Sequence, residues 1–509
     1  MKTKKQVSKF PTRLIIVGFM IICEVLLVMW IINSLSSHAI WAYTAAEFIS
    51  IVTVIVIVTQ RGDPGYKMMW IIFILLVPLF GVASYLLWGG GRMLPYFKNR
   101  MRKCSYEFMS YLPSGKDESL NLQYNDMFHF RQAEYLRKES GFPIYNGTES
   151  QYFAPGEKFF PVLLEELQKA QKYIYIEYFI LAEGKMWDKI FEVLKEKAKS
   201  GVEVKIIFDD FGSMGRQSKK FIRNIRESGI EVTSFNPILP VINIFMNNRN
   251  HRKIVVIDGN TAFTGGLNIA DEYINELERF GYWMDCAIMI KGRAVDAFLN
   301  MFCSMWKFAT GKRINYKAHL GNLIAENDGF YIPYCDDPLN DSNHAKGIYM
   351  QILNNAQKYV YITSPYLILD NSMLHAITLA AKSGIDVKIV TPSIPDKWYV
   401  HCVTQYYYSE LLESGVKIYE YKPGFIHSKL FISDDNVATV GTVNMDYRSF
   451  YLHFECGVWM SGAKSLKEIK ENFENILANS NEIDLKKWKK RSVFIKIKQD
   501  LLHLLSPLM

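Results

Sequence analysis

The sequence HRKIVVIDGNTAFTGGLN at residues 251–268 has a counterpart much later in the chain, HSKLFISDDNVATVGTVN at residues 427–444. Both stretches share the spacing H-x-K-x4-D-x6-G-x2-N. The apolar run after each lysine is typical of a buried strand, and the short polar segment that begins with aspartate is typical of a hairpin turn. Each stretch therefore predicts a β-hairpin whose histidine and lysine face one way, because residues i and i+2 of a strand point to the same side.

These hairpins belong to a longer internal repeat. The segment AQKYIYI at 170–176 returns as AQKYVYI at 356–362, and KSGVEVKI at 199–206 returns as KSGIDVKI at 382–389. In both copies the order is strand, helix, strand, which predicts βαβ units with helices covering the sheet. Two copies this far apart do not form a solenoid, whose repeats span roughly 20 to 50 residues. We therefore expect an α/β protein with two similar domains, each a mixed, mostly parallel sheet flanked by helices.

The positions shared by the two motifs suit the chemistry of a phosphodiester. Lys253 and Lys429 supply positive charge to an anion. Asn268 and Asn444 supply neutral amide donors, so both residue types can hold the oxygens of a phosphodiester and of its transition state. The glycine three residues before each asparagine removes a side chain where a ligand approaches the backbone. These glycines are Gly265 and Gly441.

The two histidines can divide the work of breaking such a bond. One can attack phosphorus, and the other can protonate the departing alkoxide, which is a poor leaving group without an acid. A single motif supplies one half of this apparatus, so we expect His251 and His427 to meet across a pseudo-two-fold axis. A single histidine–lysine pair on a solvated strand face is the plain alternative, and two copies at identical spacing argue against it.

The aspartates of the motifs lie beyond the histidine–lysine face, and two interpretations are open. They can orient the site from behind the groups that contact the substrate, or they can be turn residues, a position that aspartate favours. With these aspartates included, the candidate catalytic residues are His251, Lys253, Asp258, His427, Lys429 and Asp434.

This pattern resembles the His-Lys-Asp motif of the phospholipase D superfamily, which both halves match without a gap. The resemblance extends to Asp285 and Glu455, where the family places an acidic residue that orients an active-site histidine. An acidic partner fixes the tautomer of an imidazole and supports its protonated form. Asp285 is the shorter of the two, so the halves need not be functionally equal. The two phospholipase D-like domains are expected at 151–330 and 331–509.

The start of the chain predicts a membrane region. Apolar runs at 14–32, 40–59 and 68–88 each approach the ~20 residues that cross a bilayer core. We expect a membrane-anchoring region over 1–91, a connecting segment over 92–150 and a multi-pass protein of the cell membrane. A cleaved signal peptide is the alternative for the first run. The third run contains proline and glycine and either spans the bilayer or re-enters it.

Composition limits the partners without choosing among them. The chain has 59 Lys and Arg against 51 Asp and Glu, and this mild basic excess suits lipid headgroups or nucleic acid. Its seven cysteines contain no C-x-x-C pair, which excludes a disulfide framework and a zinc ribbon. Without an H-E-x-x-H motif or a cysteine cluster, we expect no metal and no other cofactor.

Residues 66–91 and 501–508 resemble bacterial cardiolipin synthases, so the resemblance covers nearly the whole chain. It implies transfer of a phosphatidyl group between two phosphatidylglycerols, giving cardiolipin and glycerol through a phosphatidyl-histidine. By analogy with the family, His251 is the nucleophile, and His427 is the acid and then the base. The expected partners are an anionic phospholipid and the membrane, not nucleic acid. The basic stretch 486–498 either lies on anionic headgroups or packs on the domain with a solvated face.

Other reactions of the superfamily remain open from the sequence. A hydrolase would use water as the acceptor, and another phosphatidyltransferase would exchange a different headgroup. A nuclease would use the same motifs on DNA, and a scaffold would keep the fold without the chemistry. The intact histidines, lysines and asparagines of both halves argue against the scaffold.

Overall fold

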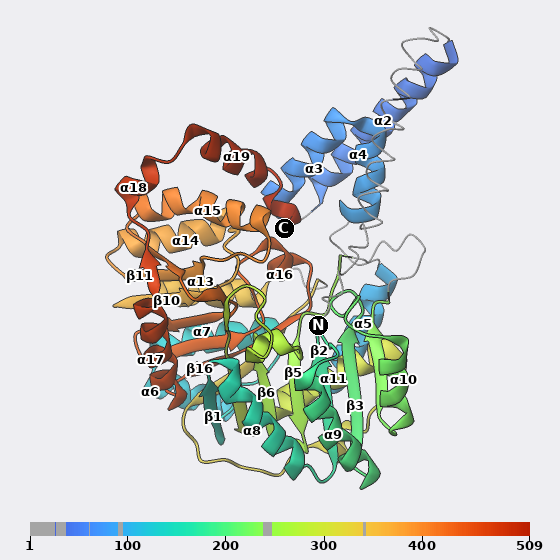
Figure 1. Ribbon diagram of the computed structural model, residues 1–509, viewed down its shortest axis with the longest axis vertical. Helices are drawn as coiled ribbons and strands as arrows, with labels where there is room; N and C mark the ends of the chain where they lie inside the picture. The colour runs from blue at the N-terminus through green and yellow to red at the C-terminus, as the bar shows by residue number, and fades with distance from the viewer. Residues whose placement is uncertain (1–25, 27–36, 61, 90–94, 238–246, 339–342) are drawn as a thin grey trace, which may run out of the picture. The chain divides into compact units, whose positions relative to one another are not determined.

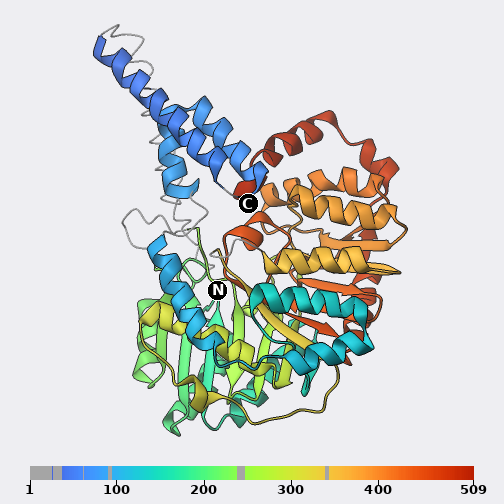
Figure 2. The same ribbon diagram turned by 180° about the vertical axis from the view of Figure 1, so that it is seen from behind.

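A computed structural model gives the fold, which Figure 1 and Figure 2 show from opposite sides. The structure describes residues 26, 37–60, 62–89, 95–237, 247–338 and 343–509. Its described residues form two compact units, one made of the amino-terminal helices and the other of the residues from 95 onward.

The amino-terminal unit is built from one helix of 23 residues and shorter helices that follow it. Its elements are α2 (Ser37–Thr59), α3 (Pro64–Leu76), α4 (Pro78–Ser84) and the π-helical turn η1 (Tyr85–Gly89). Asp63 begins α3 by accepting the N–H of Tyr66 at 3.0 Å. The expected third apolar run is divided between α3, α4 and η1, because a residue that precedes proline, here Val77, is pushed out of the helical conformation.

Membrane crossing was predicted for this unit. Among the residues that the structure describes, none of the helices combines the length and the apolarity that crossing a bilayer requires. The first apolar run lies outside the described residues except for Leu26. The predicted transmembrane region is therefore not confirmed.

In the second unit, helices precede the sheets. The expected connecting segment contains α5 (Pro95–Met109), α6 (Lys116–Asn125) and α7 (Met127–Ser140). Helix α5 packs on α11 (Val295–Thr310), and α7 packs on α13 (His344–Asn355). The predicted domain boundaries at 150/151 and 330/331 stay predictions.

Two sheets of similar size form the centre of this unit. The first sheet has, in spatial order, β1 (Thr148–Phe153), β8 (Ala287–Gly292), β6 (Thr261–Gly265), β5 (Lys253–Ile257), β2 (Tyr173–Tyr178), β3 (Glu203–Asp209) and β4 (Glu231–Phe235). The second has β17 (Ser480–Glu482), β12 (Lys417–Tyr421), β11 (Asp386–Pro392), β10 (Tyr359–Thr363), β14 (Leu430–Ser433), β15 (Val437–Gly441), β16 (Glu455–Ser461) and β9 (Phe330–Asp336). Read from its other end and without β17, the second order corresponds to the first strand for strand, so that β9 matches β1 and β12 matches β4.

The sheets are mixed, but the prediction that they are mostly parallel is wrong. Among the described strands of the first sheet, only β2–β3 and β3–β4 pair in parallel, and in the second sheet only β10–β11 and β11–β12 do. Those pairs are joined by helical crossovers, whereas each motif hairpin returns antiparallel and the following strands extend the sheet in the same antiparallel way.

Helices cover both sheets. Apolar residues at helical spacing, such as Trp187, Ile190 and Leu194 of α9, form the buried face of a covering helix. In the first half the further helices are α8 (Gly156–Lys169), α9 (Lys185–Lys199), α10 (Lys219–Glu227), the 3-10 turn η2 (Asp271–Ile274) and α12 (Tyr316–His319). In the second half they are α14 (Asn371–Lys382), α15 (Trp398–Glu413), α16 (Tyr447–Tyr451), α17 (Ser465–Ala478), α18 (Leu485–Lys489), α19 (Val493–His503) and η3 (Ser506–Leu508).

Candidate active site

The predicted motif hairpins are confirmed, and they lie at the centre of the sheets. Strand β5 pairs with β6 and β2, and β14 pairs with β15 and β10. Asp258 and Asp434 begin the turns in the left-handed region, with φ of 52° and 53°. In each half the histidine and the lysine therefore stand at the strand end opposite to the turn.

The backbone places each histidine against the other half of the chain. The N–H of His251 donates to the carbonyl of Phe454 at 2.8 Å, and the N–H of His427 donates to the carbonyl of Met284 at 2.7 Å. In the second case the contact continues as a parallel pair between β13 (Gly424–Ile426) and β7 (Tyr282–Met284). The residue that follows each carbonyl partner is the predicted acidic residue, which is thereby brought beside a histidine that lies far away in sequence.

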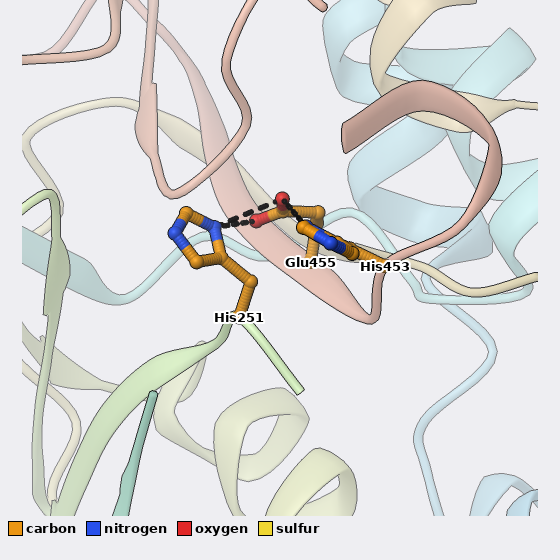
Figure 3. Close-up of side chains that lie close together, drawn as sticks. All are labelled: His251, His453 and Glu455. Carbon is orange, nitrogen blue, oxygen red and sulfur yellow. Dashed lines mark hydrogen bonds and ion pairs between the residues drawn. The ribbon is translucent and has the colours of Figure 1, made fainter. Parts of the chain in front are cut away.

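The two histidine–carboxylate pairs are crossed between the halves. Nδ1 of His251 lies 2.9 Å from both carboxylate oxygens of Glu455, and Nδ1 of His427 lies 2.7 Å from Oδ2 of Asp285. Figure 3 shows the ring of His251 with Nδ1 directed at Glu455. Because the carboxylate accepts from Nδ1–H, the lone pair of a neutral imidazole is left on Nε2. Each half thus holds one histidine and the carboxylate of the other half's histidine.

The lysines are buried beside the histidines. Nζ of Lys253 donates to the carbonyl of His251 at 2.7 Å, and Nζ of Lys429 makes the equivalent bond to the carbonyl of His427. Burial lowers the pKa of Lys253 to about 7 and that of Lys429 to about 8, although the nearby carboxylates oppose the shift. A bound anion opposes the shift further, because it favours the charged form of an amine.

Burial and positive charge also favour the neutral form of both imidazoles. Burial, followed by the charges of Lys253 and Lys429, holds the pKa of His251 well below its ordinary value. Burial and Lys429 lower the pKa of His427 to about 4, against the opposing effect of Asp285. A phosphodiester bound between the lysines brings negative charge that raises both imidazole pKa values.

Asp285 is ionised despite its burial. Burial alone would raise its pKa, but the charges of His427 and Lys429 and the hydrogen bond from His427 outweigh burial and hold the pKa below the ordinary value. Nε1 of Trp283 donates at 3.4 Å to Oδ2, the oxygen that His427 also contacts, and the N–H of Cys286 donates to Oδ1 at 2.8 Å. These donors fix the carboxylate that orients His427.

The asparagines are buried, and their surroundings differ. The amide of Asn268 accepts the N–H of Ile180 at 3.0 Å and donates to the hydroxyl of Tyr273 at 2.7 Å. The side-chain oxygen of Asn444 has no hydrogen-bond partner in the part of the chain that the structure describes. Asn268 therefore has one amide hydrogen left for a ligand, and its predicted role as a phosphate donor stays a prediction.

The predicted ligand-approach role of Gly265 and Gly441 does not match their surroundings. A Cβ at Gly265 would lie 2.4 Å from the carbonyl oxygen of Cys286, and one at Gly441 would lie 2.4 Å from that of Cys456. Both glycines thus permit close approach of the next strand of the sheet. The next residue, Gly266, is the one that borders the site, because its Cβ would lie 2.0 Å from Oδ1 of Asp285.

Asp258 and Asp434 do not belong to the catalytic centre. The carboxylate of Asp258 accepts the backbone N–H groups of 171–173 at 2.7 to 2.8 Å, and Asp434 accepts those of 357–359 at 2.7 to 2.9 Å. Asp258 comes five positions after Lys253, the first residue of β5, which is about 16 Å at roughly 3.3 Å per residue. Of the two interpretations, the geometry supports the turn residue. In addition, Asp258 and Asp434 each hold the start of the neighbouring strand through these hydrogen bonds.

Several residues around the site were not predicted. Thr442 donates its hydroxyl to Glu455, and Nδ1 of His453 lies 3.7 Å from the same carboxylate. No local motif marks these residues, because they surround His251, which lies about 200 residues earlier in the chain.

His251, His453 and Glu455 also form a set of possible metal ligands, which Figure 3 shows around one carboxylate. Their ligand atoms all lie within 4.8 Å of one another, and two imidazoles with a carboxylate are a ligand set that Zn²⁺ accepts. Spacing rules could not predict this set because His251 is 202 residues before His453. The charges of Lys253 and Lys429, which act on His251, oppose a cation at this place.

Comparison with known proteins identifies the class. The family described as "Cardiolipin synthase, PLD-like domain" matches residues 163–306 and 349–477, one stretch in each half. A family described as "Phospholipase_D-nuclease N-terminal" matches residues 48–90. The crystal structure of phosphatidylserine synthase from Haemophilus influenzae Rd KW20 superimposes with a TM-score of 0.54 at 14% identity, covering 74% of this chain and 98% of that one. The fold is therefore that of the phospholipase D-like proteins.

Whole-chain relatives narrow the class. An uncharacterized protein of Streptococcus mutans is 38% identical over 463 residues, which are 90% of this chain and 99% of that protein. A cardiolipin synthase of Geobacillus sp. (strain WCH70) is 35% identical over 461 residues, 89% of this chain and 91% of that protein. The chain belongs to the cardiolipin synthase family of the phospholipase D superfamily, and it is a phosphatidyltransferase.

Proposed function

We propose that the chain transfers a phosphatidyl group from one phosphatidylglycerol to a second, giving cardiolipin and glycerol. The observation that carries this proposal is the crossed pair of buried histidine–carboxylate contacts, His251 with Glu455 and His427 with Asp285, flanked by two buried lysines. Such a set provides a nucleophile, an acid and a cationic seat for a phosphodiester without further groups.

In the first step, Nε2 of His251 attacks phosphorus of the first lipid. The new P–N bond forms as the bond to the glycerol oxygen breaks, and His427, protonated on Nε2 once the bound phosphodiester has raised its pKa, gives that proton to the oxygen. Glu455 holds the charge that develops on His251, while Lys253 and Lys429 hold the phosphate oxygens. Family resemblance assigns the nucleophile to His251, and its low pKa is consistent with a neutral imidazole carrying a free lone pair.

In the second step, His427 returns as a base. It removes the proton from the terminal hydroxyl of a second phosphatidylglycerol, whose oxygen attacks phosphorus while the P–N bond breaks. The products are cardiolipin and a neutral His251. One phosphodiester has replaced another, so loss of glycerol is what draws the reaction forward.

The proposed place of action is the cell membrane, where the lipid substrate resides. We propose residues 1–91 as the anchoring region, 92–150 as the connection, and 151–330 and 331–509 as the two catalytic domains. The family match over residues 48–90 supports the anchor, as do the exposed apolar side chains of α2 such as Phe48 and Ile55. Nucleic acid is not part of the proposal.

The test is a product assay with the full chain in mixed micelles and phosphatidylglycerol as the sole phospholipid, labelled in the terminal glycerol. We expect cardiolipin and free glycerol in equal amounts, with no added nucleotide. His251→Ala should abolish both products, while His375→Ala, which removes an exposed histidine of α14, should leave them unchanged. Phosphatidic acid as the main product would identify a hydrolase and overturn the proposal.

A further inference from the structure

Helix α19 exposes its apolar face to solvent. Phe494 is 85% exposed, and Val493, Ile497 and Leu501 on the same side are also exposed. These four residues lie on one face, because each residue advances the helix by 100° and positions i, i+4 and i+8 stay together. In a surface helix of a water-soluble protein, the apolar face packs against the core.

The opposite face of α19 is polar, and this is the face that packs on the protein. Gln499 is buried, accepts from Nη1 of Arg491 at 2.8 Å and donates to Gln405 of α15 at 3.4 Å. The ring of His503 stacks on Tyr406 of α15, with centroids 3.9 Å apart and an angle of 11° between the planes. The helix is therefore held in place by polar and aromatic contacts and by the half-buried Leu502, while Val493, Phe494, Ile497 and Leu501 face outward. Figure 1 shows α19 beside α15.

Positive charge surrounds this apolar face. Lys498 extends over the ring of Trp398, 4.5 Å from its centroid, and Trp398 is itself 59% exposed at the start of α15. The acidic residue of α19 itself is Asp500, which lies near Glu410 and Glu413 of α15, and Glu413 pairs with Lys489 at 2.8 Å. The basic side chains of α18, α19 and the turn between them are Lys486, Lys487, Lys489, Lys490, Arg491, Lys496 and Lys498.

We propose that α19 and Trp398 lie in the headgroup layer of an anionic bilayer. An apolar helical face flanked by lysines is the form that interfacial helices take, with apolar side chains below the headgroups and ammonium groups among the phosphates. Anionic lipid is favoured over a protein partner because the flanking cations need a partner of negative charge along their whole length. The proposal goes beyond transfer chemistry, since a catalytically inactive chain would bind in the same way.

The contact would also determine how the second unit meets its substrate. Attachment at α19 adds a fixed point on the second half, separate from the amino-terminal unit in sequence. A tryptophan beside the helix suits this layer, since its ring prefers the boundary between lipid and water. The surface formed by α19 and Trp398 is thus an orienting contact with the lipid.

The experiment places a polarity-sensitive fluorophore on the full chain at Phe494→Cys, reconstituted in vesicles of equal phosphatidylglycerol and phosphatidylcholine. Spin-labelled lipids should quench it at least threefold more than the same fluorophore at Lys467→Cys, an exposed control position on α17. The unsubstituted chain corrects for labelling of native cysteines. Vesicles of phosphatidylcholine alone, or Lys486→Gln, Lys487→Gln and Lys490→Gln together, should reduce the quenching at 494 by at least half.

Three results would overturn the proposal. Equal quenching at 494 and 467 would place the helix in water. A blue-shifted emission that depends on protein concentration and not on lipid would identify a second copy of the chain as the partner. An emission already blue-shifted in dilute, lipid-free protein would identify another segment of the same chain. Because product formation is not measured, failure here is distinct from failure of the proposed transfer reaction.

Discussion

The two halves of the site have the same backbone frame but differ in what surrounds each carboxylate. Glu455, which holds His251, also accepts from Thr442 and has His453 on its far side. Asp285, which holds His427, has Trp283 in the position that corresponds to His453 and Gly266 in the position that corresponds to Thr442. The difference shows that duplication preserved the geometry of two equivalent imidazoles, while side chains around them became specialised, as expected if one histidine forms the covalent bond and the other moves protons.

The largest effect should come from the histidines themselves. Loss of either acid–base or nucleophilic function should lower turnover of phosphatidylglycerol by about 10³-fold or more. His427→Ala should still form a covalent bond with a nitrophenyl phosphodiester of the lipid, because nitrophenolate leaves without a proton. His251→Ala should not. A phosphorus label on His251→Ala that survives denaturation at alkaline pH and is lost in acid, as a P–N bond to histidine is, would assign the nucleophile to the other half.

Removing the charge of one carboxylate should have the next largest effect, about 10- to 10⁴-fold in kcat. Glu455→Gln should slow the nitrophenol burst, because Glu455 stabilises the charge that develops on His251. Asp285→Asn should slow phosphatidylglycerol turnover but leave most of the burst rate, since that leaving group needs no acid. Burst kinetics with both substrates measure the contrast. Equal losses on both substrates in both variants would contradict the division of roles.

A smaller and unequal effect is expected from the position behind each carboxylate. Gly266→Ala should reduce kcat by about 10²-fold, since a Cβ there would lie 2.0 Å from Oδ1 of Asp285 and displace it. Thr442→Ala removes one hydrogen bond to Glu455, a loss of about 10-fold. Thr442→Gly is the matched control, because it gives position 442 the residue found at the corresponding position 266. Circular dichroism confirms that each variant is folded. A larger loss in the threonine variants than in Gly266→Ala would break the comparison.

The smallest effect should be that of His453, and it should appear in acid. Burial lowers the pKa of His453 to about 4, against the opposing effect of Glu455, so the ring is neutral at pH 6 to 8. His453→Asn should therefore leave kcat within about threefold there, as a change to an uncharged neighbour does. Below about pH 5 the protonated ring competes for Glu455. The wild type should then lose activity faster than the variant as pH falls, which parallel pH profiles of the two folded proteins measure.

Local sequence patterns predicted the strands, the turns and the duplication, because they depend on alternation and on residues near in sequence. Outside the two motif hairpins, they did not predict the direction of strand pairing. Strand β5 and strand β2 have equally apolar patterns whether they pair in parallel or antiparallel, and only the connections decide it.

The site was predicted in part for the same reason. His251 and Lys253 are two residues apart at the start of a predicted strand, so the sequence alone predicts that they share a face. The contact of His251 with Glu455 joins residues 204 positions apart and depends on how the halves meet. Asp258 shares the motif with His251 but not the site, because a five-residue strand carries it to the far end of the hairpin. The length of the strand between two motif residues therefore predicts whether they share a site better than their closeness in sequence does.

The exchange of carboxylates between the halves has a consequence for inheritance. A gene fragment that encodes either half alone specifies a histidine with no acid beside it and an acid with no histidine. Each half lacks a complete dyad by itself, so its histidine gains a carboxylate only when a second half lies against it.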